Sequence, residues 1–252
     1  MLRMAAKIRL DKLLMERGLA ASRERAHALI LAGKVLVNEQ KVEKAGAAVD
    51  PAAEVRILGE DLKYVSRGGV KLAQALVHWR IDVRGLVCMD VGASTGGFTD
   101  CLLQHGAARV IAIDTGYGQI AHRLRQDPRV RLLERTNARY LKPEDVGEPV
   151  DFVAVDVSFI SATLVLPAAI GAARGGARRR IELVVLVKPQ FEAGREHVGK
   201  GGIVRDPEAH ALAVGKVADC VRSLGWEVVG TIPSPITGAE GNQEFLLYGK
   251  RS

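Results

Sequence analysis

Hydrophobic residues follow two different patterns along the chain, and the change falls near residue 60. Before it, apolar positions recur at helical spacing over residues 8–18 and 22–33, and short alternating runs follow at 34–42 and 54–58. Ser22 is placed to cap the second helix at its start, and Gly33 to end it. We therefore predict a small α+β domain over residues 1–60.

Beyond a short linker at residues 61–66, unbroken apolar runs alternate with helical segments. The runs cover residues 87–91, 110–113, 130–133, 152–157 and 183–187. This alternation is typical of parallel strands covered by helices on both faces, so residues 67–252 are predicted to form a Rossmann-like α/β domain. Two later runs, 226–232 and 244–249, predict an antiparallel pair at the edge of its sheet.

Composition narrows the class of protein. The 252 residues are 48% hydrophobic and carry a net charge of +7, which allows a large core and suits a polyanionic partner. The three cysteines form no CxxC pair, which favours a reducing cytoplasm over a disulfide framework. The six histidines show no metal-ligand spacing, so no metal is expected. We find no signal-like or membrane-spanning run, and expect no stable membrane association.

The stretch VCMDVGASTGGFTD, residues 87–100, places a glycine-rich turn after the first apolar run. Gly92 and Gly97 fit two positions of the dinucleotide motif, but Ser94 stands where a glycine would admit a pyrophosphate. The turn therefore favours a cofactor without phosphates, such as S-adenosylmethionine, over NAD. A packing turn without a ligand is the alternative. Asp114 ends the next run, 22 residues later (114 − 92), where an acid can bind ribose hydroxyls.

Charged residues stand where the later strands should end. Asp156 and Lys188 close two apolar runs, Glu244 heads the last run, and Lys71 lies in the first turn of a predicted helix. Each alone is most simply a salt-bridge partner. Together they fit methyl transfer to a sugar hydroxyl, a weak acid that needs a base. Burial and a second cation favour the neutral form of a lysine, and carboxylates can position it.

The first domain also carries a family resemblance. The string RLDKLL…GLAASRERAHALILAGKVLVN resembles the RNA-binding module of the S-four ribosomal-protein type. Basic residues cluster on its two helices, and although exposed charges are often only solvated, phosphate binding is favoured here. The candidate RNA-binding residues are Arg9, Lys12, Arg23, Arg25 and Lys34. Glu39 follows Asn38 where the family favours glycine, so we expect a turn other than the tight mirror-type one.

From Ser66 onward the chain resembles the TlyA branch of the ribose 2′-O-methyltransferases, which have an FtsJ-like fold. The motifs are SRGGVKL, DVGASTGGFTD, IDTGYGQ, ERTNAR, VDVSFIS, LVKPQFE, GKGGIVRD and EGNQEFL. The resemblance implies four catalytic residues, Lys71, Asp156, Lys188 and Glu244. It implies that S-adenosylmethionine is held by Asp90, Gly92, Ser94, Thr95, Gly96, Gly97, Phe98, Asp114 and Asn137. The implied substrate is cytidine 2′-hydroxyls of ribosomal RNA, in 16S RNA, 23S RNA or both.

Basic residues over 122–142 and 174–180 support RNA, or a ribosomal subunit, as the partner. For the oligomeric state, a monomer is favoured. Two rival functions stay open. One is an RNA-binding ribosome-assembly factor without methyl transfer, which the filled catalytic positions argue against. The other is a hemolysin-like activity, a label that the family has carried, and no spanning segment in the sequence supports it.

Overall fold

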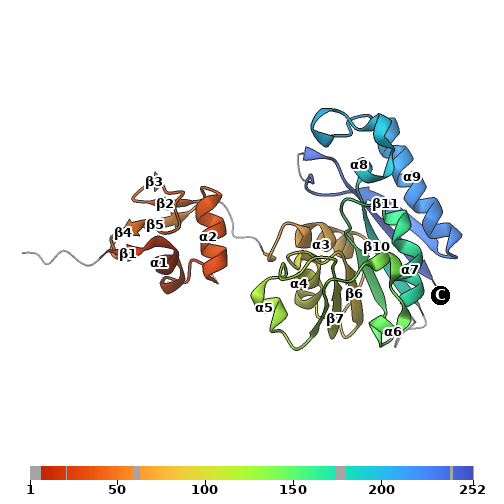
Figure 1. Cartoon of the computed structure of the whole chain (residues 1–252), viewed down its shortest axis with the longest axis horizontal. Coiled ribbons are helices and arrows are strands. Elements are labelled where there is room, and N and C mark those ends of the chain that lie inside the picture. The colour runs from red at the N-terminus through yellow and green to blue at the C-terminus, as the bar shows by residue number, and fades with distance from the viewer. Residues whose placement is uncertain (1–6, 21, 59–62, 174–179, 239–240, 252) are drawn as a thin grey trace, which may run out of the picture. The chain divides into compact units, whose positions relative to one another are not determined.

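The computed structural model describes residues 7–20, 22–58, 63–173, 180–238 and 241–251, and the chain divides into two compact units, Met1–Asp61 and Leu62–Ser252 (Figure 1). Tyr64 and Val65 fall within the predicted linker, residues 61–66, but they pack in the larger unit. The Tyr64 side chain is buried in its core, and the Val65 amide donates to Asp100 at 2.8 Å. These two residues therefore belong to the larger unit, while residues 61 and 62 lie outside the described residues.

The smaller unit folds around two helices and short strands. Its elements are β1 (Ile8–Arg9), α1 (Leu10–Glu16), α2 (Arg23–Leu31), β2 (Val35–Val37), β3 (Gln40–Lys41), β4 (Ala48–Val49) and β5 (Val55–Ile57). Leu10, Leu14 and Ile30 are fully buried between the helices and the strands. The predicted helix ends are confirmed, since Ser22 Oγ accepts from the Arg25 amide at 3.2 Å and Gly33 has φ +63°.

The turn between β2 and β3 corrects the expectation for Glu39. Asn38 and Glu39 have φ values of +49° and +61°, the positive angles of a tight mirror-type turn. Glu39 tolerates this conformation in the exposed hairpin, where its carboxylate binds Arg56 with contacts of 2.7 and 3.1 Å. The hairpin geometry and this ion pair thus override the poor preference of glutamate for the left-handed region.

The larger unit alternates strands and helices as predicted. Its strands are β6 (Val87–Val91), β7 (Arg109–Ile113), β8 (Val130–Leu133), β9 (Phe152–Val155), β10 (Ile181–Val187), β11 (Glu227–Pro233) and β12 (Phe245–Arg251). Its α-helices are α3 (Gly68–His78), α4 (Gly97–Gln104), α5 (His122–Arg125), α6 (Pro143–Val146), α7 (Leu166–Ala172), α8 (Pro189–Glu192) and α9 (Pro207–Ser223). The 3₁₀ turns are η1 (Ala138–Tyr140), η2 (Ala162–Leu164), η3 (Arg195–His197) and η4 (Lys200–Gly202).

One seven-stranded sheet carries these elements in the order β11-β12-β10-β9-β6-β7-β8. The five strands from β10 to β8 run parallel, and β12 is antiparallel to both β10 and β11. The predicted parallel sheet and antiparallel edge pair are confirmed. The chain order reverses between β6 and β9, and such a switch point, at the carboxyl ends of the strands, is where open α/β sheets bind ligands.

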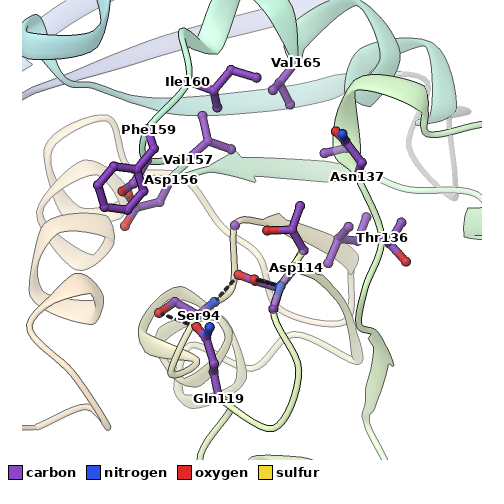
Figure 2. A pocket seen from close by; sticks show the side chains of 16 residues that line it. Ser94, Asp114, Gln119, Thr136, Asn137, Asp156, Val157, Phe159, Ile160 and Val165 are labelled. Carbon is purple, nitrogen blue, oxygen red and sulfur yellow. Dashed lines mark hydrogen bonds between the residues drawn. The ribbon is translucent and has the colours of Figure 1, made fainter.

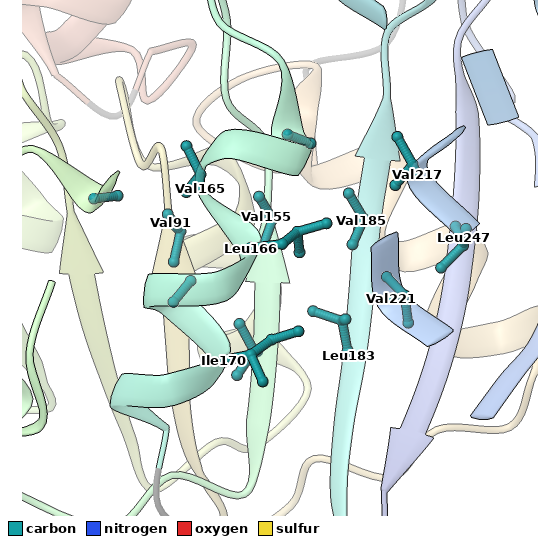
Figure 3. Packing of buried hydrophobic residues seen from close by; sticks show 14 of the residues in the cluster. Val91, Val155, Val165, Leu166, Ile170, Leu183, Val185, Val217, Val221 and Leu247 are labelled. Atoms are coloured by element: carbon teal, nitrogen blue, oxygen red, sulfur yellow. The ribbon is translucent and has the colours of Figure 1, made fainter. Parts of the chain in front are cut away.

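Alternate residues of each strand fill two cores on opposite faces of the sheet. On one face, Val91, Val155 and Val185 lie under Leu166 and Ile170 of α7, and Val217 and Val221 of α9 complete this layer (Figure 3). On the other face, Cys88, Ala112 and Val184 pack with residues of α3 and α4. Close packing on both faces fixes the strands, and with them the residues that follow each strand.

Candidate active site

The predicted site residues follow consecutive parallel strands at one edge of the sheet. Gly92 follows β6, Asp114 follows β7, Asp156 follows β9 and Lys188 follows β10, and Asn137 lies beyond β8. Because parallel strands end at the same edge, the fold brings together residues that lie up to 96 positions apart (188 − 92).

The turn after β6 is shaped by Gly92 and Ser94. Gly92 has φ +91°, and a Cβ atom there would lie 2.4 Å from the backbone carbonyl oxygen of Asp156. Only glycine allows the ends of β6 and β9 to approach this closely. Ser94 has φ +48°, and its amide donates to Asp114 Oδ2 at 2.7 Å, while Gly116 N donates to Oδ1 at 2.6 Å. The Asp114 carboxylate therefore ties two loops together beside the turn.

A cavity of about 540 Å³ opens between these loops (Figure 2). Gly92, Ser94, Asp114, Asn137 and Asp156 line it, together with apolar side chains that include Ile113, Val157, Ile160 and Val165. Its volume suits a small organic ligand. Apolar walls can take an adenine ring, and each Asp114 oxygen keeps a lone pair for a ribose hydroxyl. The residues present therefore fit S-adenosylmethionine.

A second cavity of about 260 Å³ shares Gly92, Ser94, Asp156 and Ser158 with the first. Lys71 and Lys188 line it, so the structure brings both predicted lysines to the same place beside the glycine turn. The other residues around it are Ser66, Arg67, Gly68, Ala93, Thr95, Gly97 and Phe98.

The four predicted catalytic residues form two ion pairs, and the lysine of each pair is buried. Lys188 Nζ lies 2.6 Å from Asp156 Oδ1 and donates to Ser158 Oγ at 2.6 Å. Lys71 donates to Glu244. Lys71 and Lys188 are 8% exposed, Glu244 is 2% exposed and the Asp156 side chain is 19% exposed, so each buried lysine is paired with one carboxylate. Such pairing avoids an isolated buried charge, which would be strongly unfavourable.

Two glycine contacts and one strand register hold these pairs in place. Gly68 and Gly69 are the first two residues of α3, and a Cβ atom at Gly69 would lie 2.3 Å from the Tyr64 ring. A Cβ atom at Gly238 would lie 2.2 Å from Glu244 Oε1. Glu244 directly precedes β12, whose register pairs Phe245 with Val187. The antiparallel strand thus starts where β10 ends, which brings Glu244 to the site.

Two of the predicted cofactor residues, Asp90 and Gly96, line neither cavity and instead stabilise the glycine-rich loop. Asp90 is fully buried, and its Oδ2 accepts from the Thr99 amide at 2.9 Å and from Thr99 Oγ1 at 2.6 Å. Burial, with the nearby negative charge of Asp156, raises the pKa of Asp90 to about 7. A Cβ atom at Gly96 would lie 2.4 Å from Leu124, so this glycine permits close packing of the loop.

Ser158 and Phe159 are residues that the sequence analysis did not select. Both line the larger cavity, and Ser158 also contacts Lys188. Phe159 is 93% exposed and has φ +65°, and Figure 2 shows its ring beside Asp156 at the rim of the cavity (Figure 2). No pattern in the sequence marked either residue. Both directly follow the apolar run 152–157, and a hydrophobic residue such as Phe159 is usually buried when it follows a buried strand.

In the smaller unit the predicted RNA-binding residues differ in their surroundings. Arg9 and Arg23 both bind the fully buried Asp11, with closest contacts of 2.8 and 3.1 Å, and His27 reaches the same carboxylate at 2.9 Å. The Arg9 guanidinium holds the pKa of Asp11 far below its usual range. Lys12 lies 3.6 Å from Glu16, and Arg25 and Lys34 are partly buried.

The basic stretch 122–142 is less available for RNA than its composition predicted. Three of its arginines are engaged within the unit, since Arg123 binds Asp100, Arg125 binds Glu134 and Arg129 binds Asp127. Residues 174–179 of the other basic cluster lie outside the described residues. Phosphate contacts here would therefore involve fewer free charges than the sequence indicates.

Comparison with known proteins gives the family of both units. Residues 64–251 match the FtsJ-like methyltransferase family, and residues 8–55 match the S4 domain. The 16S/23S rRNA (cytidine-2′-O)-methyltransferase TlyA of Mycobacterium tuberculosis is 49% identical over 246 residues, which cover 97% of this chain and 90% of the relative.

Two solved structures are similar to this chain, one in sequence and fold and the other in fold alone. A candidate hemolysin from Streptococcus thermophilus is 42% identical, with a TM-score of 0.75 over 99% of this chain and 90% of that chain. None of the helices described in the present structure has the length and apolar composition needed to cross a bilayer. An S-adenosylmethionine-dependent methyltransferase from Mesorhizobium loti shares the fold, at 16% identity and a TM-score of 0.51 over 70% of this chain and 96% of that chain. The chain therefore belongs to the FtsJ-like methyltransferase family, with an S4 domain before its methyltransferase domain, and S-adenosylmethionine is its cofactor.

Proposed function

We propose that the protein methylates the 2′-hydroxyl of cytidine in ribosomal RNA. The observation that carries this proposal is the pair of buried lysines, Lys71 and Lys188, beside a cavity that fits S-adenosylmethionine. The M. tuberculosis relative, named for cytidine-2′-O methylation of 16S and 23S RNA, supports the choice of nucleotide. Which of the two RNAs carries the target is part of the test below.

Lys188 is the base in this proposal. Its partners Asp156 and Ser158 line both cavities, so it stands where the methyl donor and the acceptor hydroxyl would meet. When bound, S-adenosylmethionine supplies an activated methyl group. Lys188 first gives its ammonium proton to solvent, and the neutral Nζ then takes the ribose proton and returns to the ammonium that Asp156 stabilises from 2.6 Å. Positioning of the hydroxyl and the amine in one small cavity then supplies much of the rate acceleration.

Lys71 and Glu244 hold the second half of the site. Lys71 adds a positive charge next to the acceptor oxygen, where negative charge develops during attack. Glu244 keeps that ammonium in place and balances its charge while the site is empty of substrate. In the N-terminal unit, Arg9 and Arg23 are proposed to contact RNA phosphates, because Asp11 fixes both guanidinium groups at one surface.

The test is transfer of tritiated methyl groups from S-adenosylmethionine to unmodified small and large ribosomal subunits. The wild-type protein should incorporate label, and mass spectrometry should locate it on cytidine ribose. Lys188→Ala should reduce the rate at least a hundredfold, the usual size of a lost general base. Lys250→Ala is the matched control, since Lys250 binds Glu227 at 3.1 Å and does not line either cavity.

Two outcomes would contradict the proposal. Equal label with wild type and Lys188→Ala, when both variants bind S-adenosylmethionine, would remove Lys188 from the chemistry. Label on a base, or on no ribosomal RNA, would reject ribose methylation itself. An RNA-binding assembly factor without transfer would bind the subunits and leave them unlabelled.

A further inference from the structure

A buried carboxylate outside both cavities contacts the loop that carries Asp156, Ser158 and Phe159. Glu192, the last residue of α8, is 4% exposed. Its Oε2 accepts from Ser161 Oγ at 2.5 Å, and its Oε1 accepts from the Ala162 amide at 2.6 Å. Lys216 of α9 donates to the Glu192 carbonyl oxygen at 3.0 Å, which fixes the end of α8 in turn.

This contact is the last of a series that joins the segments following β9 and β10. Lys188 binds Asp156 and Ser158, and the rings of Phe159 and Phe191 lie 5.8 Å apart. Glu192 then binds the two residues that follow Ile160. Residues 156–162 therefore contact residues 188–192 near both ends of the segment and at Phe159.

Phe159 explains why the series needs a strong final contact. An exposed aromatic residue at φ +65° is disfavoured, because the left-handed region brings its Cβ atom close to the backbone. Without restraint on both sides, the segment would relax to negative φ at this position. That change would turn Ser158 and Asp156 away from Lys188, because the three residues 156, 158 and 159 share one short loop. A strained conformation that persists beside a reactive group is a recurrent feature of functional sites.

We propose that Glu192 is a positioning residue for methyl transfer, which fixes residues 156–162 so that Asp156 and Ser158 face Lys188 and Phe159 stays at the rim of the cavity. The inference rests on the function proposed above. Glu192 does not contact either cavity, so its effect passes through Ser161 and Ala162. Two hydrogen bonds to one carboxylate make a stiffer anchor than either bond alone.

The experiment compares kcat for methyl transfer in Glu192→Ala, Glu192→Gln and Ser161→Ala. Each kcat is divided by the number of S-adenosylmethionine sites measured by calorimetry, so that unfolded protein does not count. Glu192→Ala should lower kcat per site by about ten- to a hundredfold, the effect of a reacting group displaced by about 1 Å. Glu192→Gln should stay within about threefold of the wild type, because its amide oxygen still accepts from Ala162 and its amide nitrogen can donate to Ser161.

Three further results separate positioning from general stability. The affinity for S-adenosylmethionine should fall by less than kcat per site. Gly92 and Asp114 follow other strands and keep their places, although Val157 and Ile160 of the affected segment also line the cofactor cavity. Ser161→Ala combined with Glu192→Ala should be no slower than Glu192→Ala alone, since both remove the same contact. Glu182→Ala is the control: this buried carboxylate binds Tyr248 at 2.9 Å at the opposite end of β10, and its loss should lower the melting temperature but not kcat per site.

The outcomes distinguish this inference from the proposed function. If the wild type labels no ribose, the proposed function fails. If the wild type labels ribose and Lys188→Ala does not, while Glu192→Ala has the wild-type kcat per site, the positioning role alone is refuted. The same conclusion follows if Glu192→Gln is as slow as Glu192→Ala, or if Glu182→Ala lowers kcat per site equally.

Discussion

The pKa of Asp90 predicts how the free energy of unfolding changes with pH. Its carboxyl is fully buried under that loop and bound to Thr99, and burial raises its pKa to about 7 from the ordinary 3.8. A carboxyl with a raised pKa in the folded state stabilises the fold most when it is protonated. Its contribution to the free energy of unfolding is therefore full below about pH 4 and is lost as the pH rises through about 7.

The magnitude follows from the size of the shift. A rise from 3.8 to about 7, at 1.36 kcal/mol per unit, corresponds to about 4 kcal/mol over the whole pH range. Between about pH 4.5 and 6.5 the slope is about 1.4 kcal/mol per pH unit. Asp90→Asn removes the titration but keeps an oxygen that accepts from Thr99. The wild type should therefore lose stability relative to Asp90→Asn as the pH rises, and the difference should level off above about pH 7.

Urea unfolding at a series of pH values, followed by tryptophan fluorescence, measures this difference. Both tryptophans of the chain, Trp79 and Trp226, belong to the methyltransferase domain, so the signal reports on that domain. Asp127→Asn is the control: Arg129 lowers the pKa of Asp127, so its effect should be constant between about pH 5 and 8. A constant difference between wild type and Asp90→Asn over the same range would refute the argument, because it would mean that Asp90 stays charged despite its burial.

Two other substitutions test the cofactor loop and the N-terminal unit. Gly92→Ala should abolish S-adenosylmethionine binding in calorimetry, because its Cβ would lie 2.4 Å from a backbone oxygen. The control is Gly85→Ala, at φ +71° with no atom within 4 Å, which should only lower the melting temperature. An equal loss of affinity in both variants would mean that backbone strain, and not the close approach at Gly92, causes the loss. Asp11→Asn should weaken RNA binding in fluorescence anisotropy by about tenfold, about 1.4 kcal/mol, because Arg9 and Arg23 lose their fixed positions. Removal of a negative charge would by itself tighten RNA binding. If Asp11→Asn binds RNA more tightly than the exposed control Glu16→Gln, net charge and not the position of the arginines determines the affinity.

The fold was accessible from the sequence because buried parallel strands have a strong signature. The five apolar runs and the residues that end them could be placed at one sheet edge by topology alone, as for Gly92 and Lys188. The pairing of the lysines was not accessible. Lys71 and Glu244 are 173 positions apart, and their contact depends on the register of β12, which no local pattern determines.

Other features escaped because they depend on three-dimensional surroundings. Asp90 belongs to the glycine motif in the sequence, but its side chain points away from both cavities and binds Thr99. Glu39 adopts a left-handed conformation because the hairpin and Arg56 compensate for it. The role of Glu192 follows from contacts with Ser161 and Ala162, residues at the start of another element.

The position of β12 has a consequence for how the enzyme matures. This strand is inserted between β10 and β11, so β11 is made earlier but has no neighbour in the sheet until β12 arrives. Glu244 comes with β12, and Lys71 meets its acid at the same moment. The cofactor cavity, built on β6 to β9, can form before that step, whereas the full set of four charged groups cannot. The four charged groups are therefore complete only once β12 has joined the sheet.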